Sequence, residues 1–110
     1  MICNTAFLKE QCDNDQEMVQ TMVDIFINTA PDYLQSIIEA QKSCKFQELK
    51  NAAHGFLSSL KIMGAEQIVV LTQQIEHNII DNKLESIEHL TKEVCRLTYQ
   101  ALDELNALKN

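Results

Sequence analysis

The chain has 110 residues, enough for one packed core, and we expect residues 1–110 to form a single helical bundle domain. Only two glycines and one proline are present and 45% of the residues are hydrophobic, so the composition favours an all-α fold over strands and turns. The net charge of −7 argues against a nucleic-acid partner, because phosphates require a basic surface.

The start of the chain has no charged-then-apolar leader, and no apolar run approaches the ~18 residues of a membrane span. We therefore expect a soluble, cytoplasmic protein with no membrane partner, either free-standing or cut from a larger chain. The cysteines show neither a CxxC pair nor a zinc-site spacing, and we expect reduced thiols typical of the cytosol. These cysteines are Cys3, Cys12, Cys44 and Cys95.

Helical signals begin with a short segment at Thr5–Cys12, followed by an N-capping turn at Asp13–Asp15. A longer helix is predicted from Gln16 to Thr29. Pro31 interrupts the hydrogen-bond ladder, so the chain either kinks there or begins a new helix that continues to about Ser43. The side chains expected on the inner side are Met18, Met22, Ile25, Phe26, Thr29, Leu34, Ile37, Ile38 and Gln41.

The clearest helix spans Phe46–Met63, where apolar residues recur at alternating spacings of three and four, and Gly64 follows as a helix stop. Further helices are predicted from Ala65 to Ile80 and from Lys83 to Leu108, separated by a turn at Asp81–Asn82. Short connections make consecutive helices antiparallel neighbours. The sequence therefore predicts an up-and-down antiparallel four-helix bundle with a short additional N-terminal helix.

One outward position of the clearest helix carries His54. Lys61 lies about 20° from His54 around the helix axis and about 10 Å further along it, and its side chain leans back toward the histidine. Asn51, Gly55 and Ser58 surround His54 with short side chains, so another protein could approach this face closely.

Two of these neighbours have alternative explanations. Gly55 in a helix interior costs about 1 kcal/mol relative to alanine, which a close approach of a partner would explain. Asn51 lies three residues before His54, where its amide could hydrogen-bond the ring or remain solvated. From the pattern alone, an ordinary surface histidine beside a tolerated glycine is the competing interpretation.

This segment resembles the signature of the histidine-containing phosphotransfer (HPt) domains of multistep two-component phosphorelays. Their signature is a helix reading A-H-x-L-K-G-x-S, with a glycine ten positions after the histidine. Here Ala53-His54 begins the motif, Phe56 takes the apolar position, and Gly64-Ala65 closes it. The flanking helices extend the resemblance to roughly residues 15–78, through Asp15–Phe26, Pro31–Leu34, Glu39-Ala40 and Leu71–Glu76.

The resemblance implies a phosphorelay intermediate whose partners are response-regulator receiver domains and a sensor or hybrid histidine kinase. His54 would accept a phosphoryl group from the phospho-aspartate of one receiver and pass it to another. Magnesium and most of the charge stabilisation would belong to the receiver, so no cofactor or metal is expected on this chain. We expect a monomeric carrier rather than an autonomous kinase.

Two residues depart from the family pattern, which has lysine three and glycine four positions after the histidine. This chain has Leu57 and Ser58 there. Lys61 is the candidate to supply the missing cation, the hydroxyl of Ser58 could contact the phosphate, and Leu57 could enlarge an apolar docking patch beside Gly55 and Asn51. The alternative function is a non-catalytic helical adaptor that docks a receiver without carrying phosphate.

A di-iron site is a weaker interpretation of the Glu76-His77 and Glu88-His89 pairs. Ferritin-like sites use Glu-x-x-His, whereas the residues three positions before these histidines are Gln74 and Ser86. The series Glu85, His89 and Glu93 indicates a solvated charge ladder instead.

Overall fold

The computed structural model describes residues 2–109, and within them it contains helices and no strand. The predicted all-α fold is confirmed. The predicted domain limits at residues 1 and 110 lie outside the described residues. The helices are α1 (Thr5–Gln11), α2 (Gln16–Lys42), α3 (Phe46–Ile62), α4 (Glu66–Ile80) and α5 (Ile87–Lys109).

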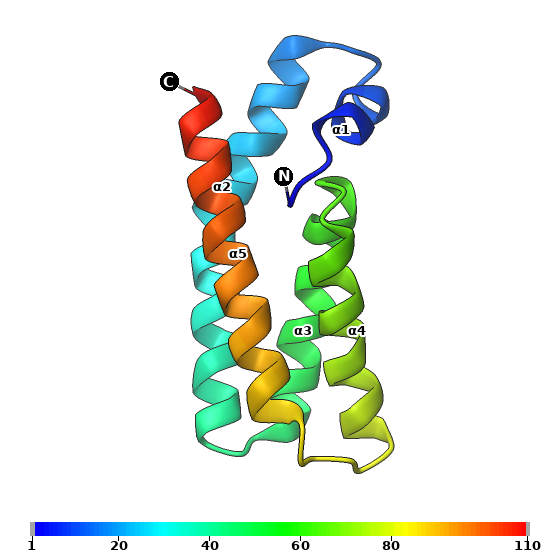
Figure 1. Cartoon of the computed structure of the whole chain (residues 1–110), viewed down its shortest axis with the longest axis vertical. Helices are drawn as coiled ribbons and strands as arrows, with labels where there is room; N and C mark the ends of the chain where they lie inside the picture. The colour runs from blue at the N-terminus through cyan, green and yellow to red at the C-terminus, as the bar shows by residue number, and fades with distance from the viewer. Residues whose placement is uncertain (1, 110) are drawn as a thin grey trace.

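The four long helices form a closed ring of neighbours. α2 packs on α3, α3 on α4, α4 on α5, and α5 returns to α2. Consecutive helices run in opposite directions along a body of 43 × 22 × 20 Å (Figure 1). This is the predicted up-and-down bundle, with α1 as the short additional helix beside the start of α2. No helix within residues 2–109 is long and apolar enough to cross a bilayer.

Pro31 does not divide the second helix. α2 is continuous through it, so the possibility of a new helix starting at Pro31 is wrong. The rotation of α2 also differs from the prediction, because Val23, Phe26 and Ala30 are buried while Met18 and Ile25 are exposed. The buried residues keep the three-and-four spacing of a single core-facing stripe.

The start and the core composition of α5 also depart from the prediction. α5 begins at Ile87, and residues 83–86 form an irregular connection. Thr91 and Thr98 occupy buried positions on its inner side, whereas Leu108 is exposed. Threonine has the branched shape of valine and fits a helix core. Because it carries a hydroxyl, a search for periodic apolar residues does not identify it.

An aromatic stack joins α2 to α3 next to the functional segment. The ring of Phe56 lies 6.1 Å from that of Phe26 and 5.1 Å from that of Tyr33, both in stacked geometry. Aromatic pairs of this kind contribute roughly 0.5–1.5 kcal/mol beyond the area they bury. The stack therefore fixes the rotation of α3 relative to α2.

The segment before α1, residues 2–4, closes one end of the bundle, and we call it the strap. The Ile2 amide donates to Oε2 of Glu104 on α5 at 3.0 Å, and the Asn4 amide donates to the carbonyl of Met63 at 3.0 Å. Between them, Cys3 is buried. In Figure 1 the strap enters between α5 and the turn that joins α3 to α4.

Gly64 is required where the strap meets this turn. Its φ is +65°, and a Cβ atom built on it would lie 2.7 Å from Cβ of Asn4. A side chain at position 64 would therefore be strained by its backbone and would collide with the strap. The glycine stops α3 and also makes room for the strap.

Candidate functional site

The central residue of the site is His54, in the middle of α3. Its neighbours Ala53 and Phe56 are fully buried on the core side, and this orients His54 outward. The imidazole side chain is 78% exposed, which confirms the predicted outward position.

Glu76 of α4 holds one side of this ring. Its Oε1 atom lies 2.9 Å from Nδ1 of His54. The Glu76 side chain is only 14% exposed, whereas the ring itself stands in solvent. Glu76 is thus the better-fixed member of the pair and limits the rotation of the imidazole.

The hydrogen bond to the Glu76 carboxylate determines which ring nitrogen of His54 can react. An ionised carboxylate can only accept a hydrogen bond, so in the neutral imidazole the proton lies on Nδ1. Nε2 of His54 then carries a free lone pair. The arrangement can therefore supply an exposed nitrogen nucleophile whose other nitrogen is held by a carboxylate.

The sequence analysis did not identify Glu76 as part of the site, although a signal was present. α3 and α4 are antiparallel and joined by a short turn at residues 63–65. Residues equally distant from such a turn lie side by side, and positions 54 and 76 are symmetric about residue 65. The symmetry of a helical hairpin thus points to the partner of His54.

On the α2 side, the predicted neighbours Gly55 and Asn51 are both exposed. A Cβ atom built on Gly55 would lie 3.4 Å from Cε1 of Tyr33, so the tyrosine ring passes close to this glycine. The Asn51 amide oxygen accepts a hydrogen bond from Nε2 of Gln47 at 3.0 Å. The ring of His54 bonds Glu76, so a hydrogen bond from Asn51 is not needed to orient it.

Beyond Ser58, the same face continues to Lys61. Both residues are exposed, and Lys61 forms no ion pair with any residue that the structure describes. Its side chain lines a groove of about 350 Å³ between α1, the end of α3 and the start of α4. The other lining residues are Asn4, Phe7, Gly64, Ala65, Glu66, Val69 and Val70.

The predicted role of Leu57 in a docking patch is wrong. Leu57 is only 6% exposed and belongs to the interior. Position 57 is turned about 60° from His54 toward α4, the side on which Glu76 lies, and this packing covers it. An apolar side chain therefore fits at position 57, where the family has a lysine. Because Leu57 is buried, it adds no apolar surface that a partner could contact.

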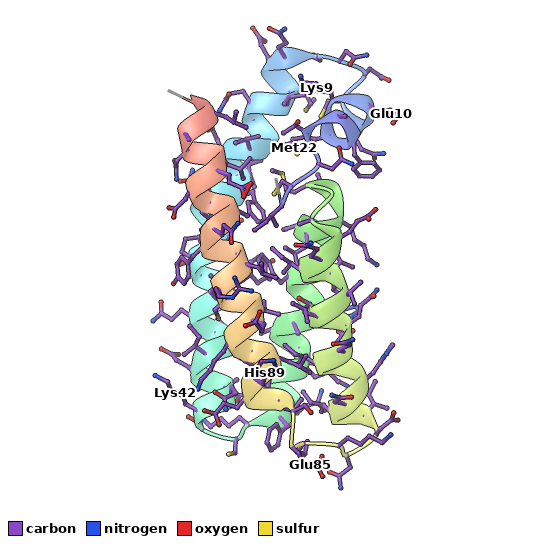
Figure 2. The ribbon with its side chains drawn as sticks, in the orientation of Figure 1. Lys9, Glu10, Met22, Lys42, Glu85 and His89 are labelled. Atoms are coloured by element: carbon purple, nitrogen blue, oxygen red, sulfur yellow. The ribbon has the colours of Figure 1, made fainter. Side chains whose placement is uncertain are left out.

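The other two histidines form no comparable site. Within residues 2–109, no group of three or more His, Cys, Asp or Glu side chains is arranged to hold a metal ion. Glu85 lies before α5 begins, so the predicted series of charged residues Glu85, His89 and Glu93 does not lie on one helix. Figure 2 shows Glu85 and His89 at the end of the bundle far from Met22. Arg96 hydrogen-bonds Glu93 at 2.7 Å and holds the pKa of that carboxyl below its usual value.

The helical bundle with a solvent-exposed histidine on its second long helix defines the class of protein. The family model described as the Hpt domain matches residues 21–110. This match covers most of the chain, so the chain belongs to the Hpt family. Its general role is that of a histidine phosphotransfer carrier in two-component signalling, a role in which domains of this family interact with receiver domains and histidine kinases.

A solved structure shows the same fold. The chain is similar to the crystal structure of histidine-containing phosphotransfer protein B (HptB) from Pseudomonas aeruginosa PAO1, with a TM-score of 0.87. Sequence identity is 17%, and the alignment covers 96% of this chain and 92% of that chain. No curated protein sequence matches the chain.

Proposed function

We propose that this chain is a phosphorelay intermediate in which Nε2 of His54 accepts a phosphoryl group from the phospho-aspartate of one receiver and passes it to another receiver. The observation that carries the proposal is the exposed imidazole held at Nδ1 by Glu76 within the family motif. A protein that only docked a receiver would need no free ring nitrogen, so the exposed ring favours the carrier over the adaptor.

The chemistry requires little from this chain. The Nε2 lone pair forms the N–P bond while the P–O bond to the aspartate of the receiver breaks, and its electron pair remains on that carboxylate. Lys61 would provide a cation for the phosphoryl oxygens, and the Ser58 hydroxyl would provide a hydrogen bond. Magnesium in the partner receiver would supply further charge stabilisation, so the proposal needs no cofactor bound to this chain.

The surface beside the reactive ring suggests where the receiver docks. Val70 is 52% exposed and Phe7 is 37% exposed on the groove that Lys61 lines. In the other direction along α3 the surface is polar, with the bonded pair Gln47 and Asn51. We therefore place the apolar centre of the docking surface at Phe7 and Val70, in place of the buried Leu57.

The direct test is phosphotransfer from a panel of phosphorylated receivers. We expect acid-labile phosphate on the wild-type chain and none on His54→Gln. The matched control is His89→Gln, which removes another exposed histidine, in the first turn of α5, and should leave transfer intact. Transfer that survives in His54→Gln would overturn the assignment.

The same panel distinguishes the adaptor. The presence of Leu57 and Ser58 at the positions of the family lysine and glycine is the observation that favours it. If a receiver binds with a measurable Kd but no phosphate reaches the chain from any receiver, the chain is an adaptor and the relay proposal is wrong.

A further inference from the structure

The contact between Glu76 and His54 has a consequence for the phosphorylated state of the ring. When Nε2 forms the N–P bond, its lone pair is used, and the ring keeps its proton on Nδ1. The imidazole then carries a positive charge. The carboxylate of Glu76, 2.9 Å from Nδ1, lies where it can compensate that charge.

The same proton controls how easily the phosphoryl group leaves. When the N–P bond breaks, its electron pair returns to Nε2. If Nδ1 keeps its proton, the leaving group is a neutral imidazole; without it, the leaving group would be an imidazolate anion, which leaves far less readily. A group that retains the proton on Nδ1 therefore makes the phosphohistidine labile.

We infer that Glu76 sets the lifetime of phosphorylated His54, keeping the ring protonated and the phosphoryl group short-lived and transferable. The inference rests on the proposed function in that His54 is the phosphoacceptor. Glu76 acts through the ring and does not touch the phosphoryl group, so it is a positioning residue. The chain would thus forward phosphate quickly rather than store it.

The placement of Glu76 supports a lasting contact. Ile75, the preceding residue, and Thr72, one turn earlier on α4, are fully buried. The backbone that carries Glu76 is therefore fixed against the core. Two lysines of α3 lie on the same helix as the ring: Lys50, which is half-buried, and Lys61, which is exposed. Glu76 is therefore the acidic group that the structure places against this ring.

The test uses phosphoramidate, a small-molecule donor that phosphorylates histidine without a receiver. After its removal, the half-life of phospho-His54 is followed by ³¹P NMR in the wild type, Glu76→Gln and Glu85→Gln. Glutamine keeps the size of the side chain and removes its charge. Glu85→Gln changes the net charge equally at an exposed position on the connection before α5. We expect a half-life roughly threefold or more longer in Glu76→Gln and unchanged in Glu85→Gln, because charge-assisted hydrogen bonds are stronger than neutral ones but are weakened by solvent.

A spectroscopic readout separates this role from a purely structural one. Long-range ¹H–¹⁵N spectra of the unphosphorylated protein should show the proton of the neutral ring on Nδ1 in the wild type. In Glu76→Ala, which has no acceptor at that position, the population should move toward protonation on Nε2. Equal half-lives in the wild type and Glu76→Gln, or an unchanged tautomer in Glu76→Ala, would overturn the inference.

The outcome is distinct from that of the proposed function. Phosphorylation by phosphoramidate with no transfer from any receiver contradicts the relay but leaves the effect of Glu76 measurable. Transfer from a receiver with no effect of Glu76 on the half-life contradicts only the inference. No phosphorylation of His54 from either source contradicts both.

Discussion

At the scale of single residues, the site depends on three side chains on two helices. In the proposed mechanism His54 supplies the nucleophile and Glu76 fixes its proton, while Lys61 lies further along the same face and lines the groove. Leu57 is buried at the position of the family lysine, and we propose that Lys61, one helical turn further on, supplies the cation instead. The chemistry then depends on whether a lysine at position 61 can reach the same oxygens.

Replacing Lys61 tests whether this residue takes the role of the family lysine. We expect Lys61→Ala to slow transfer from a receiver by roughly fivefold to tenfold, since a positioned cation stabilises developing charge but this one is exposed to solvent. Lys61→Arg should retain most of the rate. The control is Lys50→Ala, whose side chain leans away from His54. A rate that is the same in Lys61→Ala and the wild type would exclude the role.

Replacement of each glycine by alanine should change the free energy of unfolding in opposite directions. Gly64→Ala should lower the free energy of unfolding by about 1–3 kcal/mol, because φ is +65° and the new Cβ would meet Asn4. Gly55→Ala should raise it by roughly 0.5–1 kcal/mol, since an ordinary helix position gains propensity. Urea denaturation measures both. Equal effects of the two substitutions would contradict this account.

Gly55→Ala also tests close approach at the site. If a receiver passes over Gly55, the more stable variant should accept phosphate more slowly from that receiver and at an unchanged rate from phosphoramidate. Faster or equal transfer from the receiver would mean that the glycine does not provide clearance for the partner.

At the scale of helices, the periodicity of apolar residues predicted the order of the long helices and the short connections predicted their directions, but Pro31 left open whether residues 16–43 form one helix or two. It failed where polar residues are buried or apolar ones exposed, as for Thr98 in α5 and Met18 in α2. The strap was not predicted, because an irregular segment has no period to detect. In the site, the resemblance of the segment around His54 to the family motif identified the histidine, whereas Glu76 depended on the pairing of two helices in space.

The groove between α1, α3 and α4 gives a prediction for docking. Val70→Glu should weaken binding of a cognate receiver by roughly tenfold or more, because it places a charge in the proposed apolar centre. The matched control is Ile80→Glu, on the same helix and also exposed. Binding is measured by titration calorimetry with an unphosphorylated receiver. If both variants bind as the wild type does, the receiver docks elsewhere on the molecule.

At the scale of the whole molecule, a buried thiol couples stability to pH. Burial, together with the negative charge of Glu104, raises the pKa of the Cys3 thiol to about 11 from its ordinary value of 9.0. The folded state therefore holds this proton more tightly than the unfolded chain does. Its contribution to stability is complete below about pH 9 and is lost as the pH rises toward about 11.

The expected loss is up to about 2 kcal/mol between these pH values. It is measured as the change in the free energy of unfolding between pH 8.5 and 10.5, roughly the range over which the thiol titrates in one state only. Cys3→Ala should reduce this change, whatever its effect on stability at neutral pH. A pH dependence that is identical in Cys3→Ala would show that another group is responsible.

The position of the strap predicts when it docks during folding. Consecutive helices meet through short connections, whereas the hydrogen bond from Ile2 to Glu104 joins residues 102 positions apart. The entropy lost in closing a loop grows with its length, so we expect the hairpins to form first and the strap to dock onto a nearly complete bundle. Cys3, which is buried in the folded chain, should therefore become inaccessible to solvent only at the end of folding, so that protection of its thiol would mark the final step.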